Sequence, residues 1–218
     1  AFNEIWVTEP GGQKRPLRDG VASGQIKGLV ELRDVEARAG AERLGELMAK
    51  VADELNRAHN ANSSVPGPTN LTGRNVGQSL ETALAGFTGS TTIAATDANG
   101  VIQARAEIVF SGGTMTINGV AANPANFLTV LNAQLGGEAV ASFSNGVLKL
   151  GGAGGNGVAV ADDPTTPSNK AGRGFSHFFG LNDLVKTTNP SIYETGLTNA
   201  SLHGFTPGET MTFRFSGE

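Results

Sequence analysis

The chain of 218 residues contains no cysteine, and this absence removes several classes of function at once. Disulfide frameworks, thiolate zinc sites, cysteine nucleophiles and iron–sulfur clusters all need that side chain. Aromatic residues are also scarce, since the chain has one tryptophan and one tyrosine. The three histidines, His59, His177 and His203, share no metal-binding spacing such as HExxH. The sequence therefore predicts no metal centre and no cofactor.

Positive charge is limited as well, since 16 Lys and Arg stand against 20 Asp and Glu and the net charge is −4. A nucleic-acid partner needs a basic excess that neutralises phosphates, so none is expected. No stretch approaches the roughly 18 consecutive apolar residues of a membrane helix, so no membrane partner is expected either. The opening residues lack the basic-then-apolar layout of a signal peptide.

The charges that are present cluster at the start of the chain. Residues 1–62 hold 9 basic and 10 acidic side chains, and the rest of the chain holds 7 and 10 while becoming rich in Gly, Thr, Ser and Asn. Such a shift in composition indicates two structural regimes. The predicted divisions are 1–62 as a hairpin plus a helical segment, 63–80 as a linker, 81–203 as a β-rich outer domain, and 204–218 as the truncated start of a further strand unit.

The first regime opens with two short apolar-alternating runs, 2–8 and 16–21, on either side of a Pro-Gly-Gly turn signal. This pattern predicts a small hairpin. From residue 24 to about 60 the apolar period changes to that of a helix. Heptad spacing then defines one narrow apolar seam, with charged residues on the other faces. The seam residues are Leu44, Leu47, Met48, Val51 and Leu55.

One seam on so long a helix needs a partner helix, as in a coiled coil. No helical pattern of comparable length follows in the sequence. We therefore expect the partner to lie outside these residues or on another chain.

The second regime predicts a mainly antiparallel β-rich unit with one short helix, which makes the fold class α+β. Gly- or Asn-containing turns separate the expected strands, and an Asn-Pro signal opens the helix. The expected strands are 91–95, 101–110, 114–120, 139–143 and 147–150, and the expected helix covers about 123–135.

Candidate chemistry in this unit has a simpler structural interpretation in each case. The glycines of 151–157 lack the Lys-Ser/Thr of a phosphate-binding loop and are expected to form a flexible connector. Acidic residues at 97 and 162–163 lack the EF-hand pattern and are expected to belong to turns. His59 is expected to cap helix carbonyls, and no nucleophile elbow occurs. No catalytic residue is predicted, so the chain is not expected to be an enzyme.

The densest aromatic cluster consists of Phe175, Phe178 and Phe179. We expect a core plug beneath the β-rich unit. The alternative is a contact patch for a neighbouring subunit.

Residues 24–34, GQIKGLVELRD, together with 43–47 and 51–60, resemble the central helical segment of the flagellar hook-associated protein 1 family. That family's pattern is a glycine-rich approach, then G-G-L-x-x-x-R-D, L-x-x-L-A and A-x-x-x-N-x-x-H. Lys27 stands in place of one family glycine. The β-rich part is similar to the outer domain of some bacterial members. The chain would then be a central fragment without the terminal axial-core helices.

This resemblance implies a structural subunit of the bacterial flagellum at the junction between hook and filament, exported through the flagellar type III apparatus and located outside the cell. Its implied partners are copies of itself in a ring, the hook protein, the second junction protein on the filament side and an export chaperone.

Two other classes remain open from the residues alone. A secreted adhesin or glycan-binding module would use Trp6 or Tyr193 for stacking. A muramidase- or protease-like insertion would need convergent titratable groups, for which the sequence offers no candidate set.

Overall fold

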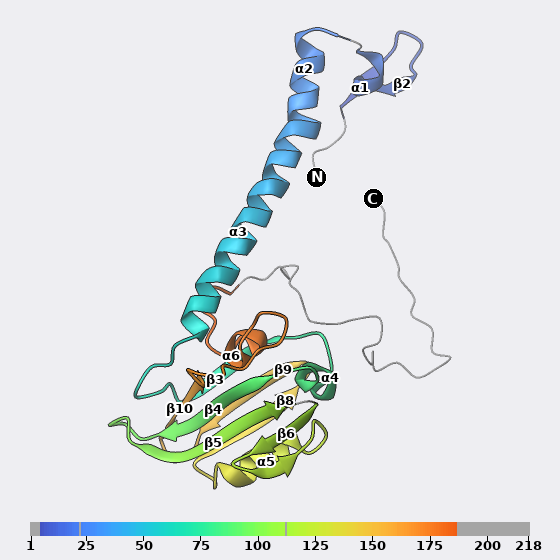
Figure 1. The fold of residues 1–218 in the computed structure, drawn as a ribbon. Helices are drawn as coiled ribbons and strands as arrows, with labels where there is room; N and C mark the ends of the chain where they lie inside the picture. Colours follow the sequence, from blue (N-terminus) through green and yellow to red (C-terminus); the bar gives the residue numbers. More distant parts are fainter. Residues whose placement is uncertain (1–4, 22, 112, 187–218) are drawn as a thin grey trace. The chain divides into compact units, whose positions relative to one another are not determined.

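The structure is a computed structural model that describes residues 5–21, 23–111 and 113–186 (Figure 1). It confirms the α+β fold class. Contacts within the chain separate two compact units, over 1–53 and 54–218, so the division falls inside the long helix and not at residue 62. The strand unit predicted for 204–218 lies outside the described residues. Among the described helices, none combines the length and apolar character that would carry it across a membrane.

The N-terminal unit begins with the predicted hairpin. Strands β1 (Trp6–Thr8) and β2 (Lys14–Pro16) pair antiparallel, and Gly12 in the turn between them adopts a φ of 81°. The second strand does not continue over 16–21 as predicted, because helix α1 (Leu17–Gly20) begins there. Pro16 is the N-cap residue of this helix, with a φ of −57°, and a proline at a helix entry removes no hydrogen bond from the helix interior.

A long helix then runs over residues 25–60, as predicted. It consists of α2 (Gln25–Glu31), the π-helical turn η1 (Leu32–Glu36) and α3 (Ala37–Asn60). Ion pairs four residues apart support its charged faces by a few tenths of a kcal/mol each. These pairs are Lys27 with Glu31 and Arg38 with Glu42.

The second unit contains a five-stranded antiparallel sheet with the order β10-β4-β5-β6-β7. Its strands are β4 (Gly89–Thr96), β5 (Ile102–Ser111), β6 (Thr114–Ile117), β7 (Val120–Ala122) and β10 (Gly157–Asp162). The single strand predicted for 114–120 is wrong. Asn118 and Gly119 have φ values of 50° and 77° and form a two-residue hairpin turn there.

A three-stranded antiparallel sheet has the order β3-β9-β8, with β3 (Asn70–Asn75), β8 (Ala139–Ser144) and β9 (Val147–Gly152). It overturns the linker predicted for 63–80, because β3 lies inside that stretch and Leu71 and Val76 are buried. Gly73, within that stretch, has a packing role. A Cβ atom there would collide with the carbonyl oxygen of Phe179.

Three short helices complete the second unit as far as it is described: α4 (Leu80–Leu84), α5 (Phe127–Gln134) and α6 (Phe175–Phe179). The predicted helix near 123–135 corresponds to α5. Its Asn132 donates to the carbonyl of Ala141 at 2.9 Å and accepts from the N–H of the same residue at 2.7 Å. This pair of bonds occupies backbone groups of β8 that the sheet leaves open.

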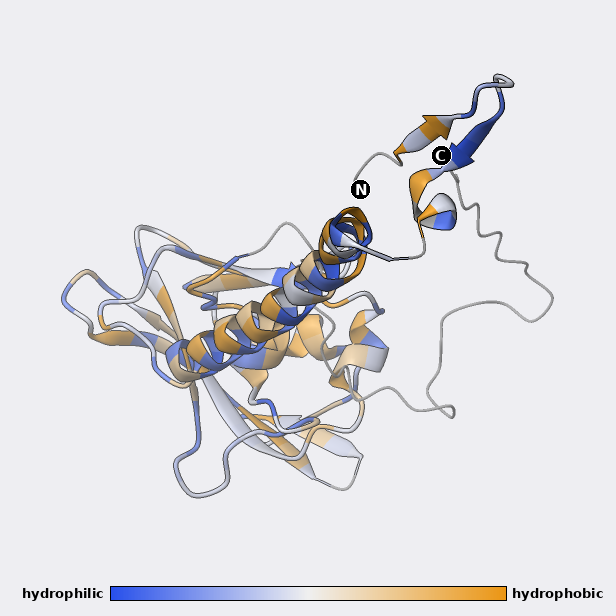
Figure 2. Cartoon of the chain, turned by 90° about the horizontal axis from the view of Figure 1, so that it is seen from above, coloured by the Kyte–Doolittle hydropathy of each residue, from blue (hydrophilic) through white to orange (hydrophobic). Residues whose placement is uncertain are grey.

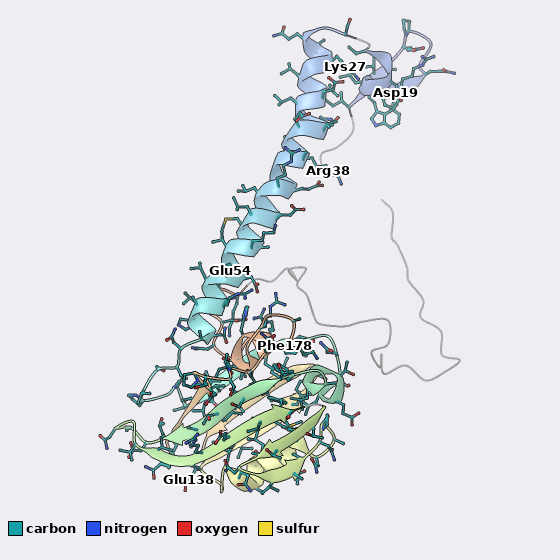
Figure 3. All side chains as sticks on the ribbon, viewed as in Figure 1. Asp19, Lys27, Arg38, Glu54, Glu138 and Phe178 are labelled. Atoms are coloured by element: carbon teal, nitrogen blue, oxygen red, sulfur yellow. The ribbon has the colours of Figure 1, made fainter. Side chains whose placement is uncertain are left out.

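One buried cluster of apolar side chains joins the two sheets and these helices. Phe175, Phe178 and Phe179 on α6 are at most 1 % exposed, and Figure 3 labels Phe178 among the side chains of the second unit. The ring of Phe87 lies 5.3 Å from that of Phe178 in an edge-to-face arrangement. The three residues are the predicted core plug. The alternative, a contact patch for a neighbouring subunit, is wrong for these three residues, because buried rings present no surface to a neighbour.

Replacing Phe175 by alanine should lower the free energy of unfolding by about 3–5 kcal/mol, because the ring is fully buried among other phenylalanines. Urea unfolding of the 218-residue chain measures this loss. Val140→Ala is the matched control, since that side chain is 54 % exposed and should change stability by less than about 0.5 kcal/mol. Equal effects of the two substitutions would contradict the core assignment.

Candidate functional site

The predicted seam on α3 is exposed to solvent along its whole length. Leu44, Leu47 and Met48 are 57–58 % exposed, Val51 is 44 % exposed and Leu55 is 48 % exposed. Apolar residues recur turn after turn along this helix (Figure 2). Large apolar side chains that alternate with charge at helical spacing and remain in water mark an interaction surface.

The π-helical turn η1 brings a further residue into line with this seam. The N–H of Ala37 donates to the carbonyl of Leu32, five residues earlier, so one residue more than usual fits into the turn. In an uninterrupted α-helix, Leu32 would lie about 120° around the axis from Leu44. The additional residue absorbs about 100° of rotation and leaves the two within about 20°. Leu32 is also 57 % exposed.

These observations define one surface, here called the apolar face. It extends over α3 and back through the π-helical turn. Its residues are Leu32, Leu44, Leu47, Met48, Val51 and Leu55.

The side of α3 that packs on its own domain is polar and buried, in contrast to the exposed apolar face. Asn56 and Asn60, in the last turns of α3, are 5 % and 4 % exposed. Both belong to the second unit, as does Leu55. With 100° per residue, Asn60 lies about 140° around the axis from Leu55. The domain thus packs on amides and leaves the leucine in water.

Asn60 is the centre of the contact between α3 and residues 176–183. Its side-chain oxygen accepts from the hydroxyl of Ser176 at 2.7 Å and from the N–H of Asn182 at 3.0 Å. Its side-chain nitrogen donates to Asp183 Oδ1 at 2.8 Å and to the carbonyl of Asn56 at 2.9 Å. Each hydrogen-bonding site of the amide is therefore used, as a buried polar group requires.

Neighbouring side chains extend this network. Asn56 donates to the carbonyl of Val185 at 2.9 Å and accepts from its N–H at 2.8 Å. Arg74 on β3 donates to Asp183 Oδ1 at 3.1 Å, which joins the sheet to the same carboxylate. His59 Nδ1 lies 2.6 Å from the carbonyl oxygen of Asn182, which lies outside α3, so this histidine meets a loop carbonyl and not the helix carbonyls that were predicted. The amides and ions together fix the end of α3 on the domain.

Sequence reasoning did not single out this network as a site. Asn56 appears in the sequence pattern of the helical segment, but Asn60 and the residues beyond 175 carry no spacing that links them to it. A pair of asparagines four residues apart in a charged helix was the available signal, because asparagine is unfavourable in a helix interior unless its amide has a partner.

The other candidate positions take the structural roles that the sequence predicted for them, apart from the glycine-rich stretch. Asp97 accepts from the N–H groups of Asn99 and Val101, at 2.8 and 2.9 Å, within a turn. Hydrogen bonds from the backbone N–H groups of Thr166 and Thr165 lower the pKa of Asp163. In the described part of the chain, no three His, Asp or Glu side chains form a metal-binding group.

The glycine-rich stretch is an ordered turn rather than a flexible connector. It joins β9 to β10 through Gly154 and Gly155, which have φ values of 63° and 92°. The side-chain amide of Asn156 donates to Glu138 Oε2 at 2.7 Å and holds the turn against the preceding strand pair. These polar groups are turned toward the chain itself rather than toward a ligand.

Of the two aromatic residues considered for glycan stacking, Trp6 is 52 % exposed on β1. Tyr193 lies outside the described residues. Only one of the two proposed stacking rings can therefore be placed on the surface.

Lys170 is a buried cation that sequence reasoning did not find. Its side chain is in a residue only 6 % exposed, and Nζ donates to the carbonyls of Thr82 and Ala83 at 2.8 and 2.9 Å. Nζ also lies 4.9 Å from the ring centre of Phe178. Burial lowers the pKa of Lys170 to about 8 despite these partners, because the ammonium group has lost its water. The lysine ties the end of α4 to the aromatic core.

Comparison of the chain with protein-family models, with curated proteins and with solved structures finds no match.

Replacing Asn60 by leucine should lower the free energy of unfolding of the second unit by about 2–4 kcal/mol, because several buried polar groups lose their partner. Amide hydrogen exchange should rise in residues 54–60 as well. Asn62→Ala is the control, since this exposed amide donates one bond, to Ala58, and should cost less than about 1 kcal/mol. A result in which both variants behave alike would remove the network from its anchoring role.

Lys170 should make stability depend on pH in the alkaline range. Between about pH 8 and pH 10.5 the unfolded chain holds the lysine proton and the folded chain has released it, so the free energy of unfolding rises with pH. The rise should reach about 3 kcal/mol and level off on both sides of that window. Lys170→Met, measured by urea unfolding in the same buffers, should lack this rise. A parallel dependence in the two proteins would contradict the lowered pKa.

Proposed function

We propose that this chain is a structural subunit of the bacterial flagellum at the junction between hook and filament. It acts by packing against other subunits and makes or breaks no bond. The observation that carries the proposal is the apolar face: six large apolar side chains stay in water along a helix whose amide side is docked on its own domain. A helix with an exposed apolar face of this kind is expected to pack against another protein surface.

The N-terminal unit supports the same proposal. Among its described residues, Val30 is the one buried apolar side chain. A unit with so little core gains most of its stability from packing against partners, since helical propensity alone supports a helix only marginally in water. Glycines at 28, 40 and 45 lower that propensity further.

The second unit has the opposite character, which fits an outward-facing domain. It has a continuous core and a covered sheet edge at Ala141. It needs no partner to fold, and would carry the helix and tolerate solvent on its other sides.

The partners in this proposal are copies of the chain arranged in a ring, the hook protein on one side and the second junction protein on the filament side. An export chaperone would hold the chain before it passes through the flagellar type III apparatus. The site of action is then outside the cell. Many modest contacts add up in such an assembly, because each subunit is held by several neighbours.

Purified protein should co-sediment with isolated hooks and should capture the second junction protein. Leu47→Asp should weaken this capture by at least about 30-fold, because a carboxylate replaces an apolar group in the buried contact. The melting temperature of the second unit should not change, since Leu47 is exposed in the free chain.

Val140→Asp is the matched control for that experiment. It places the same charge at an equally exposed apolar position on β8, away from the helix, and should leave capture intact. Failure of the unmodified protein to bind hooks or the second junction protein would exclude the junction role. Equal capture by Leu47→Asp and Val140→Asp would exclude the apolar face as the contact.

A further inference from the structure

The end of α3 is held by residues 182–185, here called the strap, and the helix contributes amides rather than apolar groups to this contact. Residues 54–62 are all described, and the buried side chains among them are Asn56 and Asn60. The strap leaves Leu184 61 % exposed. Residues 54–62 and the strap together are called the clasp. A contact with so little buried apolar surface opens more easily than a hydrophobic core does.

Asn182 connects the strap to the helix end through both its backbone and its side chain. Its N–H donates to Asn60 Oδ1 at 3.0 Å. Its side-chain amide donates to the carbonyls of His59 and Asn62 at 3.2 and 3.1 Å. The strap thus supplies donors at the C-terminal end of α3, where helix carbonyls no longer have an N–H four residues further along the helix.

The hydrogen bonds of the clasp are directional, so they form or break as a set. The amide of Asn60 bonds to α6, to the strap and to the preceding turn of α3 at the same time. A rotation of the helix end that breaks one of these bonds misaligns the others. The clasp is therefore either bonded or open, with no stable arrangement between the two.

Opening the clasp returns its polar groups to water instead of leaving them buried without a partner. Each hydrogen bond is then exchanged for bonds to water, so its net cost is small. Arg74 on β3 would lose Asp183 but retain the carbonyl of His177, to which Nη2 donates at 2.6 Å. Helix α6 would stay in place, because Phe175 and Phe179 are fully buried in the core.

We propose that the clasp opens and closes as one unit while the two sheets and α6 remain folded. It is a conformational device: the closed clasp fixes the rotation of the helix end, and the open clasp releases it. This inference does not rest on the proposed function, since the contacts that carry it all lie within the second unit.

The absence of cysteine from the chain allows single thiol probes to test the proposal. Ser176→Cys places a thiol on α6 beneath Asn60, at a position 4 % exposed. Thr91→Cys places one at a fully buried position on β4 and is the matched control. Each full-length variant is mixed with the thiol reagent DTNB, which reacts when its site opens, and the labelling rate is measured at increasing urea concentrations.

Ser176→Cys should react at least about 100-fold faster than Thr91→Cys, because the clasp opens without global unfolding. Its rate should also depend much less on urea, since clasp opening exposes little surface. Equal rates with equal urea dependence would overturn the proposal, because the clasp would then open only when the core unfolds.

Hydrogen exchange of the unmodified chain supplies a second test, without a substitution in the network. The amides of Ala61 and Val185, which bond to Arg57 and Asn56, should share one opening constant. That constant should exceed the constant for the amide of Ile93 in the core.

Asn182→Ala should accelerate exchange at Ala61 and at Val185 by the same factor, at least about fivefold, and leave Ile93 unchanged. Gln134→Ala is the control, since it removes an exposed acceptor for Asn118 outside the clasp and should alter neither amide. Unequal factors at Ala61 and Val185 would overturn the claim of a single unit. Hook binding tests the apolar face instead, so the two proposals stand or fall separately.

Discussion

The packing of amides, rather than leucines, between α3 and its domain is the constraint on which the rest depends. A buried asparagine must use its hydrogen-bonding groups, and Asn60 does so with four partners. That requirement sets the rotation of the helix end about its own axis. Because the amide side faces inward, Leu55 is turned to water. An apolar contact at the same place would have tolerated many rotations, whereas this one tolerates few.

The π-helical turn has a related effect in the N-terminal unit. An extra residue in a helix is unfavourable on its own and persists where it serves the packing of the whole. Here it rotates Leu32 toward the line of Leu44, so that two stretches with different apolar phases share one side. Among the described residues of this unit Val30 is the one buried apolar side chain, so removal of its exposed apolar side chains from water would stabilise it.

Much of the fold could be predicted because it follows from local rules. The helix over 25–60 has a clear 3.6-residue period, and β5 alternates buried Ala106 and Ile108 with outward Arg105 and Glu107. The prediction of a linker over 63–80 was wrong for a physical reason. Glycine in β3 signals either freedom or close approach, and only the position of Phe179 in space decides between them.

The sequence by itself determined the elements and the existence of an apolar seam, because period, turn residues and charge density act over a few neighbouring positions. Tertiary structure decided which side of α3 is buried, that the phenylalanines of α6 are core, and that Lys170 loses its water. Each of these depends on contacts between residues that are far apart in the chain, such as Asn60 with Asp183. No local pattern encodes such a contact, since its free energy arises only when folding brings both partners out of water together.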